Sequence, residues 1–210
     1  MRGQLRITID MTESASRTSA YHFPLCVMKT KKNDSNQIKM NRIVNLNKNL
    51  INVKNKIYDK LDYKISNFIN EDEGIEYDAC RFELNGAKII CRSSKITPKK
   101  IGQFVTFWKR NNDGLTEPHS ENDPIDFYVI NVKTDNNFGQ FVFPKAELIK
   151  KRIISTNTKE GKRGFRIYPK WDIAKNKQAI KTQNWQLKYF YEICSTHEYI
   201  SKAEELYSEK

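Results

Sequence analysis

The sequence of 210 residues lacks long apolar runs and is poor in cysteine, and both absences exclude classes of protein. Its apolar runs are a few residues long, far below the roughly 20 that cross a bilayer, and none has the length of a signal-peptide core. We therefore expect no membrane partner and a cytoplasmic location. Its four cysteines form no Cys-x-x-Cys motif and lie beside no histidine at zinc-ligand spacing, which argues against a structural zinc site.

Several catalytic and repeat architectures are also without support. No glycine-rich phosphate loop of the P-loop or dinucleotide type is present. His119 has no serine or cysteine partner fixed by a motif, so a nucleophilic triad has no basis. No internal repeat is visible, which sets solenoids and propellers aside. We expect no cofactor, and one domain with its own core, which is a monomer by default.

Positive charge is abundant and unevenly distributed. The formal net charge is +12. The segment from Lys151 to Phe190 has eleven Lys or Arg against Glu160 and Asp172, a balance of 11 − 2 = +9. The rest of the chain therefore sums to only +3. One segment supplies most of the positive field, and a polyanion is the partner that it suggests.

The sequence divides into three regions. Residues 1–40 are polar, without a sustained apolar period, and we predict a poorly ordered extension. Residues 41–191 form the domain, which begins with an amphipathic helix over 41–70, either continuous or broken near Asn52, because apolar residues recur there at intervals of three and four. The acidic turn 71–74 ends this helix. Residues 192–210 are predicted to be an acidic tail that frays.

Strands follow from residue 77 onward, where the apolar period changes to two. A hairpin turning at Asn85-Gly86 joins strands 77–84 and 87–93 and pairs Cys80 with Cys91. That pair falls at a hydrogen-bonded position, where a disulfide fits poorly, so we expect two buried thiols. Segments 102–110, 125–132, 138–143 and 165–168 are further strands, of which 125–132 and 138–143 are apolar on both faces and therefore central.

Helices complete the predicted domain. A short helix over 145–151 follows Pro144, and a final helix begins after Asp172, which would be its N-cap, with Ala179, Ile180 and Leu187 along one face. Helix, mixed strands and helix predict an α/β (α+β) fold, with a mixed central sheet flanked by helices. The order of the strands does not follow from the sequence.

The basic strand 165–168 carries the first candidate site. If Phe165 and Ile167 face the core, the alternation of a strand places Arg166 and Tyr168 on the opposite face. Arginine pairs with phosphate and aromatic rings stack on bases. The alternative is a solvated strand whose aromatic residues belong to the core. The candidate nucleic-acid-binding residues of this segment are Lys159, Lys162, Arg163, Arg166, Tyr168, Lys170 and Trp171.

A second basic group lies earlier in the chain, around Pro98 and at the end of the strand 102–110. If it shares a face with the first group, the two would form a groove for a duplex; the alternative is ordinary surface lysine. Counterion release makes these alternatives measurable. The group comprises Lys95, Lys99, Lys100, Lys109 and Arg110.

An acidic region lies between the basic ones, with a balance of 3 − 7 = −4 over residues 111–150. Clustered carboxylates bind Mg²⁺ for phosphodiester chemistry, but most of these acids lie in what reads as a solvated loop. Asp126 differs because it begins a hydrophobic strand. It is a candidate metal ligand or, alternatively, a strand-end residue paired with Lys145.

Several long motifs in chain order resemble the MepB family, which is named for a gene in bacterial multidrug-export operons. The resemblance covers about residues 47–191. It rests on the stretches KITPKKIGQFVTFWKR at 95–110, DF at 126–127, GQFVFPK at 139–145, GKRGFRIYP at 161–169, WD at 171–172 and TQNWQ at 182–186.

The resemblance implies a cytoplasmic protein without an assigned enzyme activity and with a core similar to that of restriction endonucleases. That core places an Asp and then a Glu-x-Lys or Asp-x-Lys around a metal. Carried over, Asp126 is the first acid and Lys145 the lysine, but Phe143 stands where the second acid belongs, and Glu83 is another candidate acid. The resemblance therefore implies a nucleic-acid groove that has lost cleavage.

Three hypotheses remain open. The first is a nucleic-acid-binding protein of little sequence specificity that contacts the phosphate backbone of DNA or RNA. The second is a Mg²⁺-dependent nuclease, the one case in which a cofactor is expected. The third is an accessory protein of an export system that binds an acidic protein or a small ligand.

Overall fold

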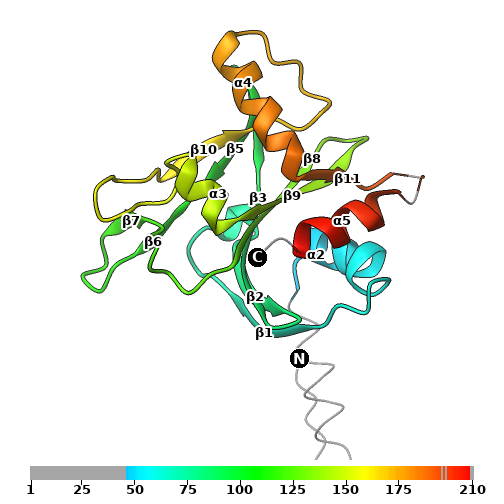
Figure 1. Ribbon diagram of the computed structural model, residues 1–210, viewed down its shortest axis with the longest axis horizontal. Coiled ribbons are helices and arrows are strands. Elements are labelled where there is room, and N and C mark those ends of the chain that lie inside the picture. The colour runs from blue at the N-terminus through cyan, green and yellow to red at the C-terminus, as the bar shows by residue number, and fades with distance from the viewer. Residues whose placement is uncertain (1–45, 195, 197, 209–210) are drawn as a thin grey trace, which may run out of the picture.

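A six-stranded mixed sheet forms the centre of the molecule in the computed structural model, which describes residues 46–194, 196 and 198–208 (Figure 1). The predicted extension over 1–40 lies outside the described residues. Strands β3 and β8 run parallel, and the other neighbours run antiparallel. The predicted mixed sheet is confirmed. Its strands, in spatial order, are β1 (Ile65–Asn70), β2 (Cys80–Leu84), β3 (Ala87–Ser93), β8 (Phe127–Lys133), β9 (Phe138–Pro144) and β11 (Phe190–Glu192).

The hairpin of β2 and β3 has the predicted register. Leu84 pairs with Ala87 across the turn, and Cys80 pairs with Cys91. Both cysteines are buried and free. Asn85 and Gly86 have positive φ angles of 48° and 83°, the conformation that a tight two-residue hairpin turn requires. Local turn chemistry thus fixes this part of the sheet.

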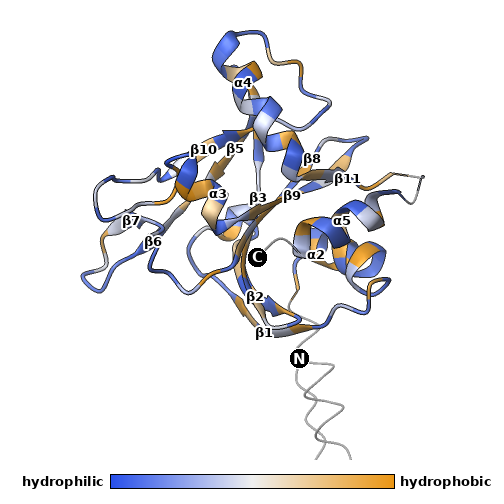
Figure 2. Cartoon of the chain, in the orientation of Figure 1, coloured by the Kyte–Doolittle hydropathy of each residue, from blue (hydrophilic) through white to orange (hydrophobic). Residues whose placement is uncertain are grey.

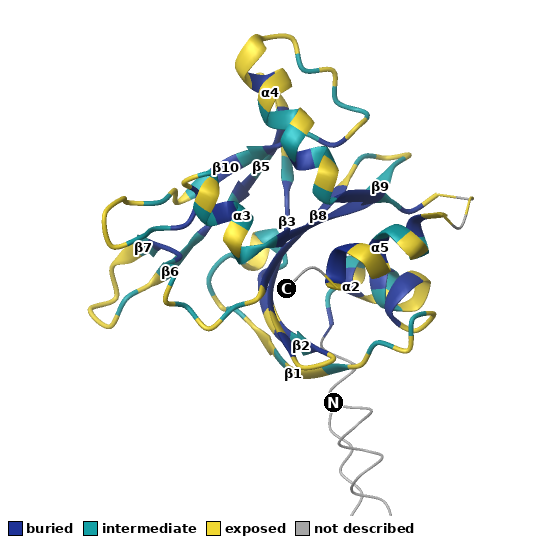
Figure 3. Cartoon of the chain, in the orientation of Figure 1, coloured by how far each residue is buried: buried dark blue, intermediate teal, exposed yellow. Residues whose placement is uncertain are grey.

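Strands β8 and β9 are buried on both faces, as predicted (Figure 3). On β8, Phe127 and Val129 belong to one hydrophobic cluster, whereas Tyr128 and Ile130 belong to a second cluster on the other face. The strand period of two separates them. Hydrophobic residues concentrate in the sheet, and the loops around it are mainly hydrophilic (Figure 2).

The first cluster is covered by helical segments from the two ends of the described chain. Those segments are α2 (Lys48–Val53), a π-helical turn η1 (Lys54–Tyr58) and α5 (Glu198–Ser208). The second cluster is covered by α3 (Lys145–Lys150), α4 (Lys177–Gln186), the 3₁₀ turn η3 (Leu187–Tyr189) and a small sheet. The predicted short helix after Pro144 is confirmed.

The chain between β3 and β8 leaves the main sheet and supplies four strands to two smaller sheets, and a strand from after β9 completes the first of them. The three-stranded sheet has the order β10 (Gly164–Ile167), β5 (Lys100–Thr106) and β4 (Lys95–Thr97). The two-stranded sheet pairs β6 (Trp108–Arg110) with β7 (Thr116–Pro118). Elsewhere, a 3₁₀ turn, η2 (Ile75–Tyr77), precedes β2 of the main sheet. The prediction of one strand over 102–110 is therefore wrong, because this segment forms two strands, β5 and β6, in different sheets. The strand predicted over 165–168 is present as β10, one residue earlier.

The prediction of one helix over 41–70 is wrong for its second half, because β1 is a strand. Residues 41–45 lie outside the described part. One extra residue separates Ser66 and Ile69 relative to their partners on β2, and Asn67 has a left-handed φ of 51°. This bulge lets Ile65 and Phe68, three residues apart, pack against the same core. A bulged strand thus imitated the spacing of a helix.

Two predictions about the C-terminal part are also wrong. Asp172 does not cap the final long helix of the domain; Asn176 does, and its Oδ1 accepts a hydrogen bond from the amide of Ala179 at 2.8 Å. Residues 198–208 do not fray but form α5, whose Tyr199 and Leu206 are buried in the first cluster. The acidic side chains of this helix concealed its apolar face. No helix in the described part of the chain has the length and apolar character to cross a membrane.

Candidate nucleic-acid interface

The basic strand β10 alternates as predicted. Phe165 and Ile167 are buried in the second cluster, and Arg166 and Tyr168 lie on the opposite face, half-buried. β10 pairs antiparallel with β5, with Arg166 opposite Phe104. The prediction about this face is confirmed, and it places two candidate residues beside α4.

A cleft of about 510 Å³ lies between β10, α4 and the end of α3. We call it the basic cleft. It brings together residues that are up to 86 positions apart (186 − 100 = 86), and no carboxylate is among those that line it. The charged and aromatic residues that line it are Lys100, Lys151, Lys162, Phe165, Arg166, Tyr168 and Trp185.

The lysines of the basic cleft differ in whether their ammonium groups contact other side chains. Lys151 lies 3.2 Å from the carboxylate of Glu147, and its Nζ lies 5.2 Å from the ring centroid of Trp185. Lys100 and Lys162 are exposed, and neither ammonium group has an ion pair or hydrogen bond with another described residue. These two groups are therefore available to an anion without breaking an existing pair.

Arg166 is held within the fold. Its guanidinium donates to the carbonyl of Gly102 at 2.9 Å and to Oγ1 of Thr97 at 2.8 Å, with longer bonds to the carbonyls of two neighbouring residues. These contacts tie β10 to β4 and β5. Arg166 thus contributes a fixed positive charge beside the cleft rather than a side chain that swings to a phosphate.

Gln186 joins the strand and the helix on either side of the cleft. This fully buried side chain accepts a hydrogen bond from the amide of Tyr168 at 2.9 Å and donates one to the carbonyl of Arg166 at 2.8 Å. The carboxamide therefore satisfies the two backbone groups at the end of β10. The position of Tyr168 at the cleft depends on this buried residue.

The remaining predicted residues of the basic segment lie outside the basic cleft. Lys159 is exposed on the preceding loop. Arg163 pairs with Glu160 at 2.7 Å and donates to the carbonyl of Thr116. Lys170 pairs with Glu192 at 2.5 Å, a hydrogen bond that raises the pKa of this lysine.

Trp171 is half-buried and packs edge-on against Phe190, with ring centroids 5.6 Å apart. It contacts the second cluster. The packing of Trp171 therefore agrees with the alternative prediction, in which the aromatic residues of this segment belong to the core.

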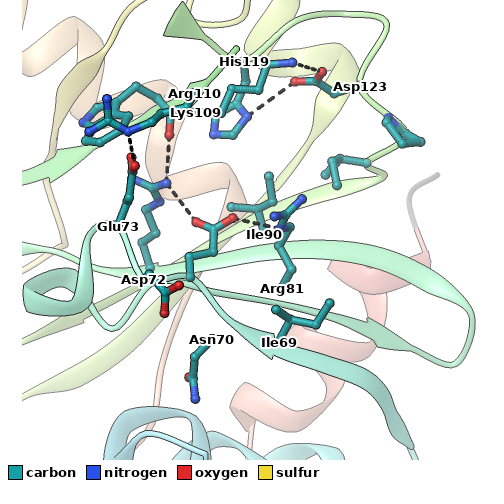
Figure 4. A pocket seen from close by; sticks show the side chains of 15 residues that line it. Ile69, Asn70, Asp72, Glu73, Arg81, Ile90, Lys109, Arg110, His119 and Asp123 are labelled. Atoms are coloured by element: carbon teal, nitrogen blue, oxygen red, sulfur yellow. Dashed lines mark hydrogen bonds and ion pairs between the residues drawn. The ribbon is translucent and has the colours of Figure 1, made fainter. Parts of the chain in front are cut away.

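Lys109 and Arg110 are not brought to the basic cleft. They lie on β6 and line a different pocket (Figure 4). Burial lowers the pKa of Lys109, but its hydrogen bond to Asp123, at 2.5 Å, outweighs this and raises it. Arg110 pairs with Glu73 and donates to the carbonyl of Gly114 at 2.5 Å. Lys95 of the same predicted group pairs with Glu76. Of that group, Lys100 alone lines the basic cleft.

The candidate catalytic residues do not assemble as the resemblance implied. The carboxylate of Asp126 accepts from the amide of Lys88 at 2.8 Å, while Nζ of Lys145 donates to the carbonyls of Glu121 and Asp123 at 3.0 and 2.9 Å. The predicted ion pair between Asp126 and Lys145 is therefore wrong for the described structure.

Phe143 and Glu83 occupy the other two positions considered for the second acid of a metal site. Phe143 is fully buried, stacked on Phe141 and packed against Trp185, so its position faces a hydrophobic core. Glu83, half-buried on β2, lies 3.5 Å from the hydroxyl of Ser66. Within residues 46–194, 196 and 198–208, no three His, Cys, Asp or Glu side chains are grouped to hold a metal ion.

Sequence reasoning missed Lys151 and Trp185 as members of the cleft. Both lie inside the +9 segment, and Trp185 lies within a motif that resembled the MepB family. The signal for Trp185 was its position nine residues after the cap of α4, on the side that meets β10. To use this signal, the sequence analysis would have had to begin the helix at Asn176 rather than at Asp172.

The fold and the cleft define a protein with a mixed α+β sheet and a carboxylate-free basic cleft. A family model described as MepB-like matches residues 71–192, and the chain belongs to this family. A solved structure described as the crystal structure of MepB is 32% identical, with a TM-score of 0.63, over 71% of this chain and 99% of that chain. The predicted family is confirmed.

A second solved structure is described as the bacterial homing endonuclease I-Ssp6803I. It is 16% identical, with a TM-score of 0.37, over 63% of this chain and 81% of that chain. This similarity is too low to assign a fold. The restriction-endonuclease-like core therefore remains what the resemblance to the MepB family implies. A comparison with curated proteins finds no match.

Proposed function

We propose that this protein binds nucleic acid through the phosphate backbone at the basic cleft, with little sequence specificity. The observation that carries the proposal is the convergence of four cations, Lys100, Lys151, Lys162 and Arg166, in a cleft lined by no carboxylate. Elsewhere on the described surface, Arg163, Lys170 and Arg110 are each paired with an acid. A cleft of one charge sign favours a polyanion.

Two aromatic rings support a nucleic acid over other polyanions. Tyr168 and Trp185 line the same cleft as the lysines. Bases stack on aromatic rings, and this stacking tolerates any base, whereas the carboxylate side chains of an acidic peptide have no ring to stack. Lysine ammonium groups act as point charges toward phosphate, and phosphate contacts carry no sequence information directly. Together these features support binding with little preference for sequence.

The test is a titration of fluorescently labelled single-stranded DNA, duplex DNA and RNA of equal length, each at two salt concentrations. Poly-glutamate of matched charge is the control for a general response to polyanions. We expect binding of nucleic acid that weakens as salt rises, and weaker binding of poly-glutamate. Equal or tighter binding of poly-glutamate would favour an acidic protein partner instead.

A pair of variants locates the site. Lys100→Ala with Lys162→Ala removes the two unpaired ammonium groups of the cleft and leaves its internal contacts intact. Lys56→Ala with Lys60→Ala removes the same charge from exposed residues in and just after η1, which packs on the opposite face of the sheet. The first pair should weaken binding and the second should not. Equal effects would place the interface elsewhere.

A further inference from the structure

An apolar groove of about 340 Å³ adjoins the basic cleft, and Lys100 lines both. We call it the isoleucine groove. Its lining comes from the hairpin of β4 and β5 and from residues 171–175, which belong to the loop between β10 and α4 at the top of Figure 1. Two segments that are about 70 positions apart in the chain therefore form one concave surface.

Three isoleucines of this groove are open to water. The exposed fractions of Ile96, Ile101 and Ile173 are 63%, 40% and 78%. The half-buried Trp171 also lines the groove. Apolar residues exposed singly are ordinary, but several of them around one concave surface are typical of an interaction site. A partner that covers these side chains gains the free energy of removing apolar surface from water.

The hairpin also places a strand edge at this surface. β4 is the last strand of the three-stranded sheet, and β5 is the only strand that pairs with it within the described residues. Its other edge carries amide and carbonyl groups that no described strand pairs. An extended peptide that adds to such an edge gains main-chain hydrogen bonds, and pockets beside the edge select its side chains. The site therefore suits an extended segment rather than a compact ligand.

The charge around the groove is mainly positive. Lys100 and Lys175 line it and are exposed, and neither ammonium group has an ion pair or hydrogen bond with another described residue. Lys99 and Lys177 stand beside this lining in the chain and are exposed too. The one carboxylate of the lining is the half-buried Asp172. Acidic groups of a partner can therefore pair with these lysines without breaking an existing ion pair.

This combination of charge and apolar surface distinguishes the possible occupants. A second copy of the chain would bring the lysines of the two grooves face to face, and like charges across an interface are unfavourable. A nucleic acid would meet the lysines, but isoleucine side chains give its bases no ring to stack on. An extended segment with both apolar side chains and carboxylates matches the isoleucines, the lysines and the strand edge.

We propose that the isoleucine groove binds a short, extended segment of a partner protein, apolar at its centre and flanked by acidic residues. The segment adds to the edge of β4. Its apolar side chains pack against Ile96, Ile101 and Ile173, and its carboxylates pair with Lys100 and Lys175. The isoleucines lie outside the basic cleft, so this inference does not rest on the proposed function.

NMR of the protein with labelled isoleucine methyl groups tests this. The probe is a capped peptide of sequence Asp-Glu-Leu-Val-Leu-Glu-Asp at up to about 1 mM, the weak end of specific binding. We expect shifts at Ile96, Ile101 and Ile173 and none at Ile51, an exposed isoleucine of α2. One control peptide has serine in place of the apolar residues, and another has lysine in place of the acidic ones. Each should bind at least about 10-fold more weakly.

Variants of exposed residues locate the site without disturbing the core. Ile173→Ser should weaken binding of the acidic peptide roughly 10-fold, because it removes apolar surface that the peptide covers. Ile75→Ser is the matched control, since Ile75 is 73% exposed and lies on η2, outside the groove. Lys175→Glu should weaken binding as well, whereas Lys162→Ala, in the basic cleft, should leave it unchanged.

The proposal is overturned if the acidic peptide shifts none of the three groove isoleucines, or if either control peptide binds as tightly. Wild-type affinity in Ile173→Ser would also contradict it. Sedimentation and adsorption to phosphatidylserine vesicles examine the other occupants. Self-association or vesicle binding that Ile173→Ser abolishes would overturn the proposal, because the groove would then serve a second copy or a membrane surface.

Discussion

Gly102 and Tyr168 approach so closely that a side chain on Gly102 would collide with the tyrosine ring. A Cβ atom there would lie 2.6 Å from Cε1 of Tyr168, and Gly102 has a φ of 84°, which L residues rarely adopt. Both the backbone conformation and the space beside Tyr168 therefore require a glycine at position 102. It lets β5 bend in the left-handed region and leaves room for the ring that borders the basic cleft.

Gly102→Ala should destabilise the protein and displace Tyr168. The backbone conformation alone costs roughly 1–2 kcal/mol, and the collision adds to it. Gly86→Ala is the matched control, because Gly86 has a φ of 83° but nothing within 4 Å of the added methyl group. Thermal unfolding should show a larger loss for Gly102→Ala than for Gly86→Ala. Equal losses would mean that the ring yields freely.

Gln186→Leu tests the buried link between α4 and β10. The substitution leaves the amide of Tyr168 and the carbonyl of Arg166 without their partner, which should cost about 2 kcal/mol or more. Gln178→Leu changes an exposed residue of the same helix and should cost much less. Chemical denaturation measures both. Similar values for the two variants would deny Gln186 this role.

His119 should make stability depend on pH below about 7, near and below the ordinary pKa of histidine. Burial lowers its pKa in the folded protein, so the unfolded chain binds a proton first as pH falls. Stability from this group is present above the unfolded pKa of about 6.5 and is lost as pH falls toward the folded value, by at most roughly 1.4 kcal/mol per pH unit. His119→Phe should flatten this slope. An unchanged slope in denaturation at several pH values would contradict the assignment.

Asp126→Asn tests the nuclease alternative. The side chains of Asp126 and Lys145 bond to backbone groups rather than to each other, and the buried Phe143 stands where the resemblance implies a second acid. We expect no cleavage of plasmid DNA by the protein with Mg²⁺ or Mn²⁺. Cleavage by the wild-type protein that Asp126→Asn abolishes would restore the nuclease hypothesis.

Local chemistry explains which elements were predictable. The Asn85-Gly86 turn fixed the hairpin register, and the apolar runs of β8 and β9 identified central strands. The bulge at Asn67 defeated the periodicity argument because it gave a strand the spacing of a helix. The N-cap of α4 is Asn176 rather than Asp172, and the chain between these two residues is not helical.

The candidate site was only partly predictable for a different reason. The sequence identified Lys162, Arg166 and Tyr168, which are close together in the chain, on β10 and directly beside it. It linked them to Lys100 only on the condition that the two basic groups share a face, and it did not identify Trp185. Contacts between distant segments depend on how β5 and α4 pack against β10. Nor did the sequence show that Arg166 is engaged with backbone carbonyls. Charge patterns reveal a basic segment, but the pairing of each charge is a property of the fold.

The salt dependence of nucleic-acid binding by cleft and control variants tests the central claim most directly. Each lost phosphate contact lowers the slope of log affinity against log salt by roughly 0.7 for single strands and 0.9 for duplex DNA. Lys100→Ala with Lys162→Ala should therefore lower it by roughly 1.4 to 1.8. Lys56→Ala with Lys60→Ala should leave the slope at the wild-type value. A wild-type slope in the cleft variant would contradict phosphate binding at the basic cleft.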